Sequence, residues 1–165
     1  KPPFRLADGA VAEALHEATK AVARGLRPVV LDGLAITRLG SFLALTPENG
    51  HDAIAARAAS VVEALDAFRA PPTADDLARR RAAGLTERQE ALMERWGYPY
   101  VMEEFRFHMT LTGPLPPAEA EQVKSALVPH LDPRLPRPYR VDSLSLFGEG
   151  ADGRFRELHR YALSG

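Results

Sequence analysis

The stretch FRFHMTLTGPLPP, residues 105–117, alternates between two kinds of side chain. Its first four odd-numbered positions are apolar, and the even-numbered positions between and after them carry Arg106, His108, Thr110 and Thr112. Successive side chains of a β-strand point to opposite faces, so this pattern predicts a half-buried strand over about residues 101–112. A histidine and a threonine two residues apart then share the exposed face of that strand.

In the first half of the chain, apolar residues at helical spacing lie before and after a segment that is typical of a β-hairpin. A helix is expected from an N-cap at Asp8 to Gly25, and a second follows apolar positions from Ile54 to Phe68. Between them, LAITRLGSFLALTP (34–47) predicts two short strands around a turn near Gly40.

Capping signals organise the middle of the chain. Thr73 with Asp76, and Thr86 with Gln89, have the spacing of capping boxes, which open helices, and Gly97 is placed to end the second of these helices. A short helix at about 118–128 follows the proline-rich stretch. The last segments, YRVDSLSLF (139–147) and GRFRELHRYAL (153–163), predict strands around a glycine-rich turn.

Composition narrows the class of protein. The 165 residues have a net charge of −1 and a pI near 6.6, so no overall positive field draws the chain to nucleic acid or to an anionic membrane. Without cysteine, the chain can form neither a disulfide nor a thiolate nucleophile. No apolar run is long enough to cross a bilayer and no signal peptide is visible, so we expect a cytoplasmic protein with no membrane partner.

Two segments of the chain repeat each other. RPVVLDGLAI (27–36) and RPYRVDSLSL (137–146) share Arg, Pro, Asp and Leu at the same spacing. Upstream of each copy, KPPF (1–4) and TGPL (112–115) both lead into a predicted helix. The repeat predicts an α+β protein of two pseudo-symmetric lobes of antiparallel sheet with outer helices, within a single bilobal domain over 1–165. Lobe one covers about 1–47, a helical insertion about 48–97 and lobe two about 98–165.

The residues around His108 also resemble a known family. FRFHMTLTGPL is similar to the second signature of the two-histidine (2H, LigT-like) phosphoesterase superfamily, which carries one His-x-Thr or His-x-Ser in each of two symmetric lobes. GYPYVMEEFRFHMTLTG and the opening KPPFRLADG resemble, more narrowly, a branch of unknown function that accompanies phosphonate-utilisation genes. In that branch the first motif immediately precedes a Pro-Phe-Arg-Leu stretch, like residues 3–6 here. The first histidine is therefore expected just before Lys1, among residues missing from this sequence.

The resemblance implies a metal-independent phosphoesterase that acts on a cyclic phosphate or a small phosphodiester, in phosphonate metabolism. His108 would serve as one of two acid–base groups and Thr110 as a hydrogen-bond donor to the transition state. The residues expected to contact substrate are Arg106, Tyr98, Tyr100 and Lys1. The sequence holds no HExxH motif, no clustered His/Asp set and no P-loop, so no metal and no cofactor are expected.

Two other functions remain open at this point. The site is expected in a cleft between the sheets of the two lobes. That cleft could instead belong to a binding module without catalysis, which holds a phosphate ester or an RNA end. An RNA-end-processing 2H enzyme is the third hypothesis, although the near-zero net charge does not favour nucleic acid as the partner. The oligomeric state and the exact substrate are not determined by the sequence.

Overall fold

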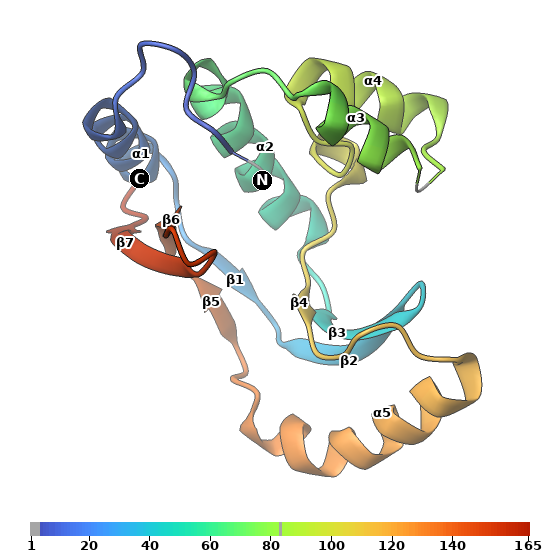
Figure 1. Cartoon of the computed structure of the whole chain (residues 1–165). Coiled ribbons are helices and arrows are strands. Elements are labelled where there is room, and N and C mark those ends of the chain that lie inside the picture. Colours follow the sequence, from blue (N-terminus) through green and yellow to red (C-terminus); the bar gives the residue numbers. More distant parts are fainter. Residues whose placement is uncertain (1–3, 83) are drawn as a thin grey trace. The chain divides into compact units, whose positions relative to one another are not determined.

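A computed structural model describes residues 4–82 and 84–165 of the chain, which forms two units of helix and antiparallel sheet. Unit 1 comprises the described residues up to Pro28, Ala55–Phe105 and Asp142–Gly165, and unit 2 comprises Val29–Ile54 and Arg106–Val141. The expected mixture of helices and antiparallel strands is confirmed (Figure 1). The chain passes between the units near residues 28, 54, 105 and 141, so the lobe boundaries suggested by the repeat stay a prediction.

Unit 2 is built on a three-stranded sheet in the order β2-β3-β4. The predicted hairpin is confirmed: β2 (Leu34–Leu39) and β3 (Phe42–Pro47) pair along their full length around Gly40, whose φ of +58° suits a glycine turn. The short strand β4 (Met109–Thr110) joins the free edge of β3.

One helix covers the apolar face of this sheet. Helix α5 (Pro117–Leu131) starts with a proline in its first turn and lies beside β2 and β3 (Figure 1). The short 3-10 helix η3 (Asp132–Arg134) follows it. The fully buried side chains of Leu31, Leu34 and Leu43 form the centre of the core, together with Ala120 of α5.

The first parts of the two repeat copies pair with each other inside unit 2. Strand β1 (Val29–Leu31) runs antiparallel to β5 (Tyr139–Val141), with Val30 opposite Arg140. Val30 and Arg140 are also equivalent positions of the repeat, 110 residues apart. Antiparallel pairing of two equivalent strands about equivalent residues creates a local two-fold axis at that pair. The register therefore agrees with the repeat that the sequence predicts.

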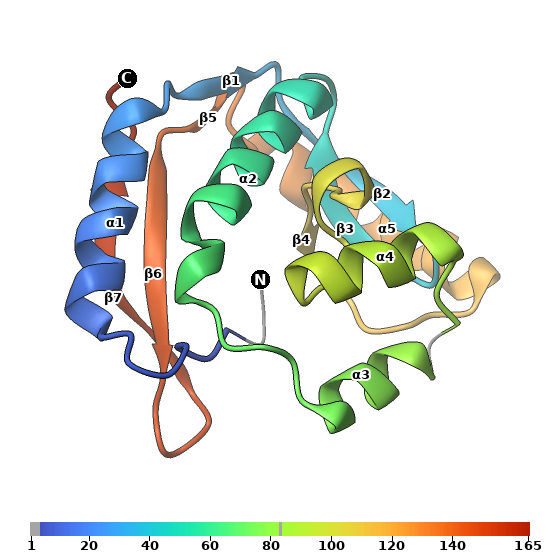
Figure 2. The same cartoon turned by 90° about the horizontal axis from the view of Figure 1, so that it is seen from above.

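Unit 1 contains the remaining sheet and most of the helices. Strands β6 (Ser143–Glu149) and β7 (Phe155–Ala162) form a two-stranded antiparallel sheet with a bulge between Leu146 and Phe147. Helix α1 (Ala12–Gly25) packs against both strands (Figure 2). Ala23, Tyr161 and Leu163 form the buried centre of this contact.

The helices of unit 1 begin and end largely where the sequence predicts. Helix α2 (His51–Leu65) and the 3-10 turn η1 (Asp66–Phe68) stop before the prolines at 71 and 72. Both predicted capping boxes are present, at the starts of α3 (Ala74–Arg81) and α4 (Glu87–Trp96). The predicted N-cap Asp8 is wrong, because α1 starts after Val11, which makes no side-chain capping bond.

The predicted strand over 101–112 is much shorter in the structure. Residues Met102–Glu104 form a 3-10 turn, η2, in which Met102 has a φ of +50°, incompatible with an extended strand. Glu104 accepts a 2.9 Å hydrogen bond from Gln89, and Glu103 pairs with Arg88, so this segment is held by α4. Only Met109–Thr110 enters the ladder with β3.

None of the helices in the described part of the chain has the length and apolar character needed to cross a membrane.

Candidate functional site

The His-x-Thr motif lies at the edge of the unit 2 sheet. Thr110 of β4 pairs with Ala44 of β3, and Met109 pairs with Leu45. The odd-numbered side chains from 107 to 111 pack on the core, whereas His108 and Thr110 are exposed. The predicted division of this stretch into an apolar face and a polar face is thus confirmed, although the regular strand is short.

The ring of His108 is held by two neighbours. Its Nδ1 lies 2.7 Å from the carbonyl oxygen of Arg106, which can only accept a hydrogen bond. Nδ1 therefore carries the proton, and Nε2 presents its lone pair in the neutral ring. The ring of Phe42 lies 5.7 Å from the imidazole, centroid to centroid, at an angle of 47°. This arrangement leaves Nε2 as the nitrogen that can exchange a proton with a bound molecule.

The two threonines of the motif have different surroundings. Thr110, the second residue of β4, is exposed and lies two positions after His108. Thr112 is half-buried, and its Oγ1 accepts a 3.1 Å hydrogen bond from the backbone N–H of Leu43 and donates a 2.8 Å bond to the carbonyl of Gly113. Thr112 therefore completes the backbone pairing at the end of β4, while Thr110 is exposed to solvent.

The other predicted substrate contacts fall in separate parts of the chain. The side chain of Arg106 is exposed in unit 2, on the same polar face as His108. Tyr98 and Tyr100 belong to unit 1, where their rings meet edge to face at 5.7 Å and the guanidinium of Arg80 lies 4.7 Å from the Tyr98 ring. Lys1 lies outside the described residues.

Three contacts at the motif were missed by the sequence analysis. The carbonyl of Arg106 orients His108, Phe42 packs against its ring, and Thr112 bonds to the β3 backbone. A backbone carbonyl carries no sequence signal, since every residue has one. The contacts with β3 depend on the register between two strands about 65 residues apart, which the alternation pattern does not specify.

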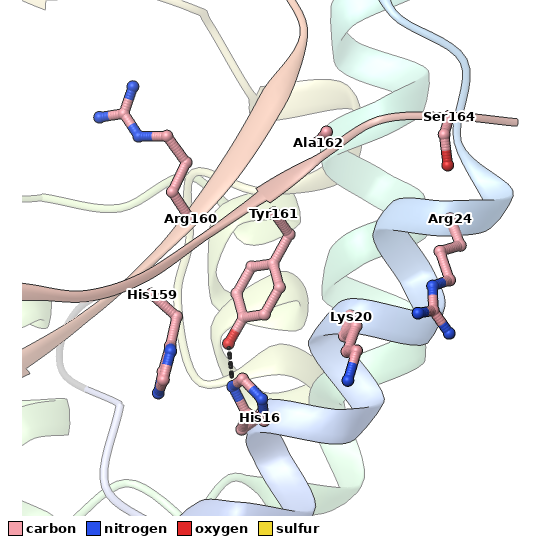
Figure 3. Close-up of a pocket in the computed structure, with 8 residues that line it drawn as sticks. All are labelled: His16, Lys20, Arg24, His159, Arg160, Tyr161, Ala162 and Ser164. Carbon is pink, nitrogen blue, oxygen red and sulfur yellow. Dashed lines mark hydrogen bonds between the residues drawn. The ribbon is translucent and has the colours of Figure 1, made fainter.

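A second group of polar side chains gathers in unit 1. A pocket of about 400 Å³ lies between α1 and β7, and Figure 3 shows the side chains that line it. His16 Nδ1 lies 2.8 Å from the hydroxyl of Tyr161, and the ring of His159 lies 4.1 Å from that of His16. The lining residues are His16, Lys20, Arg24, His159, Arg160, Tyr161, Ala162 and Ser164.

Neighbouring groups shift the pKa values of Glu17 and Tyr161 near this pocket. The ammonium of Lys20 lies 3.1 Å from Glu17 and holds the pKa of that carboxyl below its usual range. Burial raises the pKa of Tyr161, with smaller contributions from Glu17 and Glu13, so its hydroxyl keeps its proton at neutral pH. A carboxylate oxygen from each of Glu13 and Glu17 and a ring nitrogen of His16 lie within 4.8 Å of one another, so these three groups are candidate metal ligands.

Unit 1 also holds a larger and more apolar pocket of about 790 Å³. Its walls come from α1, α2 and the two strands β6 and β7, with apolar side chains from each. Neither this pocket nor the one beside His16 includes a residue that the sequence analysis proposed for catalysis or substrate contact. The His108 site is therefore described by its motif and its hydrogen bonds.

Comparison with known proteins found a matching family model and two similar curated proteins. A family model described as "Protein of unknown function (DUF1045)" matches residues 1–156. A protein of Janthinobacterium sp. (strain Marseille), named ribose 1,5-bisphosphate phosphokinase PhnN, is 39% identical over 170 residues, which are 100% of this chain and 38% of that protein. A protein of Laribacter hongkongensis (strain HLHK9) with the same name is 36% identical over 160 residues, 97% of this chain and 37% of its own length.

The chain thus spans less than two fifths of the length of these curated relatives. No solved structure matches the chain.

Proposed function

Because the chain belongs to the DUF1045 family and exposes both His108 and Thr110 at the short strand β4, we propose that it is a phosphoesterase. Its substrate would be a cyclic phosphate or a small phosphodiester, and the reaction would need no metal ion. The observation that carries this proposal is the hydrogen bond from His108 Nδ1 to the Arg106 carbonyl, which directs Nε2 away from the backbone.

The chemistry requires one proton to leave and one to arrive. Water gives a proton to a base as its oxygen bonds to phosphorus, the P–O bond on the opposite side breaks, and the departing oxygen takes a proton from an acid. Nε2 of His108 can fill either role, according to the side of phosphorus that faces it. The hydroxyl of Thr110 would donate a hydrogen bond to a phosphoryl oxygen, where negative charge gathers in the transition state.

The second acid–base group would come from the first motif expected by the repeat. In unit 2, β4 adds a third strand next to β3. The equivalent hairpin of the repeat is β6–β7, and within the described residues β7 pairs with β6 alone. We expect a strand upstream of Lys1, bearing the first His-x-Thr, to pair with β7 as β4 pairs with β3.

The substrate class rests on the relatives and on the resemblance to the phosphonate-associated branch. The printed name of both relatives concerns a ribose bisphosphate, and this favours a phosphorylated sugar as substrate in phosphonate metabolism. The name also says kinase, but this chain aligns with less than two fifths of each relative and contains no P-loop motif. We therefore do not propose the phosphokinase activity of the relatives for this chain.

The proposal is tested by replacing His108 with asparagine in the complete protein. The side-chain amide of asparagine can still donate to the Arg106 carbonyl, so the fold is kept while Nε2 is lost. We expect hydrolysis of a panel of cyclic phosphates, including a ribose cyclic phosphate, to fall by about 10²–10⁴-fold. His130→Asn, on an exposed histidine of α5, is the matched control and should keep wild-type turnover.

Substitutions of Thr110 and Thr112 test the different roles of the two threonines. Thr110→Val should lower kcat with little change in stability, because the exposed hydroxyl is not needed by the fold. Thr112→Val should lower the free energy of unfolding by about 1 kcal/mol, because the Leu43 N–H loses its acceptor. Wild-type turnover in His108→Asn would contradict the assignment. Loss of activity with EDTA while the protein stays folded would contradict the metal-free mechanism.

Binding without turnover would favour the other function classes. If the protein holds a phosphate ester through His108 but hydrolyses nothing in the panel, the chain is a binding module. Tight binding of RNA ends that weakens steeply with salt would instead indicate an RNA-end-processing protein.

A further inference from the structure

Glu13, His16 and Glu17 form a group of potential metal ligands on one face of α1. Their spacing of three and four residues brings them to the same side of the helix. A carboxylate oxygen from each glutamate and a ring nitrogen of His16 all lie within 4.8 Å of one another. With His16 neutral the three groups carry two negative charges, so the cluster attracts a cation.

One distance inside the cluster matches the requirement of a tetrahedral ion. His16 Nε2 lies 3.4 Å from Glu17 Oε1. Two ligand atoms that each lie about 2.0–2.1 Å from a tetrahedral Zn²⁺ are separated by about 3.3 Å. An ion placed between this pair would therefore need little movement of either side chain.

The imidazole of His16 is already oriented by partners on β7. Tyr161 is buried, and its hydroxyl lies 2.8 Å from Nδ1 of His16, as the dashed line in Figure 3 shows. The ring of His159 packs against the same imidazole at 4.1 Å. Metal-binding histidines usually have such a partner on the second nitrogen, which fixes the ring and leaves the other nitrogen for the ion.

From this geometry we propose that Glu13, His16 and Glu17 bind a divalent transition-metal ion such as Zn²⁺, with Tyr161 positioning the imidazole. One nitrogen and two carboxylate oxygens leave a fourth position for water. Imidazole favours Zn²⁺, Ni²⁺ or Co²⁺ over Mg²⁺, which prefers oxygen ligands alone. The site uses unit 1 residues alone and plays no part in the chemistry proposed for His108.

The ion would strengthen the start of α1. This helix begins after Val11 without a side-chain cap, so its first N–H groups lack that support. An ion held by Glu13 and by Glu17, one turn later, would connect the first two turns. Lys20 now binds both oxygens of Glu17 and would have to release them, which makes Lys20 a competitor of the metal.

Calorimetric titration of the complete, untagged protein with Zn²⁺ tests the site. His16→Asn keeps an amide that can bond to Tyr161 but removes Nε2, and Glu13→Gln removes one ligand. Each should weaken Zn²⁺ binding at least about tenfold, as should the loss of the positioning hydroxyl in Tyr161→Phe. The matched controls are Glu63→Gln on α2 and His130→Asn on α5, which are both exposed and should leave the affinity unchanged.

Lys20→Met separates a cation site from an anion site. Removing the competing ammonium should tighten Zn²⁺ binding several-fold, while Mg²⁺ should not bind detectably. A separate titration with inorganic phosphate tests the alternative, in which Lys20 and Arg24 bind an anion. In that case Lys20→Met should weaken phosphate binding. Phosphate binding of that kind, or Zn²⁺ affinity equal in wild type and His16→Asn, would overturn the proposal.

Discussion

At the residue scale, backbone groups do as much as side chains to prepare the proposed site. The Arg106 carbonyl accepts a hydrogen bond from Nδ1 of His108 and so decides which ring nitrogen carries the proton. The Leu43 N–H donates a hydrogen bond to the hydroxyl of Thr112, whereas Thr110 is exposed. The sequence alone predicts that His108 and Thr110 share an open face. It does not predict the tautomer of His108 or the different roles of the two threonines, because both depend on backbone atoms of neighbouring residues.

Asp76 accepts several short hydrogen bonds at the start of α3. It accepts hydrogen bonds from Arg5 at 2.6 Å, from Arg79 at 2.7 Å and from the backbone and hydroxyl of Thr73. Arg5 contributes most and Thr73 next to holding the pKa of Asp76 well below its usual range. One side chain thus joins the start of α3 to the N-terminal segment.

These bonds predict a pH dependence of stability. A carboxyl whose pKa is lower in the folded state stabilises the fold above its unfolded pKa of about 3.9, and this contribution is lost as the pH falls toward the folded value. Asp76→Asn should lower the Tm by a few degrees at pH 7, and the difference from wild type should shrink below about pH 4. The control is Asp75→Asn, the exposed neighbour. A Tm difference that is constant with pH would contradict this account.

At the scale of elements, local signals are reliable where the chain supplies its own hydrogen-bond partners. Both capping boxes, the hairpin around Gly40 and the end of α4 at Gly97 were predicted, because each depends on residues within a few positions. The long strand over 101–112 was wrong, since Gln89 and Arg88 of α4 bind Glu104 and Glu103 and the chain turns at Met102. Contacts with another element decided the outcome there.

Gly97 provides a test at this scale. It ends α4 in the left-handed conformation, with a φ of +70°, and a Cβ added there would lie 2.6 Å from Nη1 of Arg69. Gly97→Ala should therefore lower the free energy of unfolding by about 1–2 kcal/mol. Gly25→Ala is the matched control, because Gly25 ends α1 in open space without a positive φ. Chemical denaturation of both variants measures the difference, and equal stability would show that the end of α4 tolerates a side chain.

At the scale of the whole molecule, neither unit is a continuous piece of chain. The core of unit 2 combines Leu31, Ile36 and Leu43 from its first segment with Ala120 and Val123 from its second. The apolar face of the β2–β3 hairpin is therefore buried only when α5 is present. Cutting the chain after residue 105 would remove α5 and expose the apolar face of the hairpin.

Two truncations test this dependence. A fragment of residues 1–141 keeps both segments of unit 2, whereas a fragment of residues 1–105 loses β4, α5 and β5. In hydrogen-exchange measurements the amides of β3 should be protected in the longer fragment and exchange rapidly in the shorter one. Equal protection in both fragments would show that the hairpin is stable without α5.

The features that could be predicted without a structure are those that arise from neighbours along the chain. These are the mixed α+β class, the hairpin, the capping boxes and the polar face that carries His108 and Thr110. Strand alternation and cap spacing are local, and the repeat could be read by comparing two short segments. The antiparallel pairing of β1 with β5 joins equivalent residues of the two copies, Val30 and Arg140.

The contacts between residues far apart in the sequence became visible in the folded structure. It placed Phe42 and the Leu43 N–H against the His-x-Thr stretch, turned residues 101–105 onto α4, and brought Tyr161 and His159 to His16 across about 145 residues of sequence. The physical reason is that these contacts depend on strand register and on helix packing. Both are set by burial of the two cores as a whole, and no short segment carries that information.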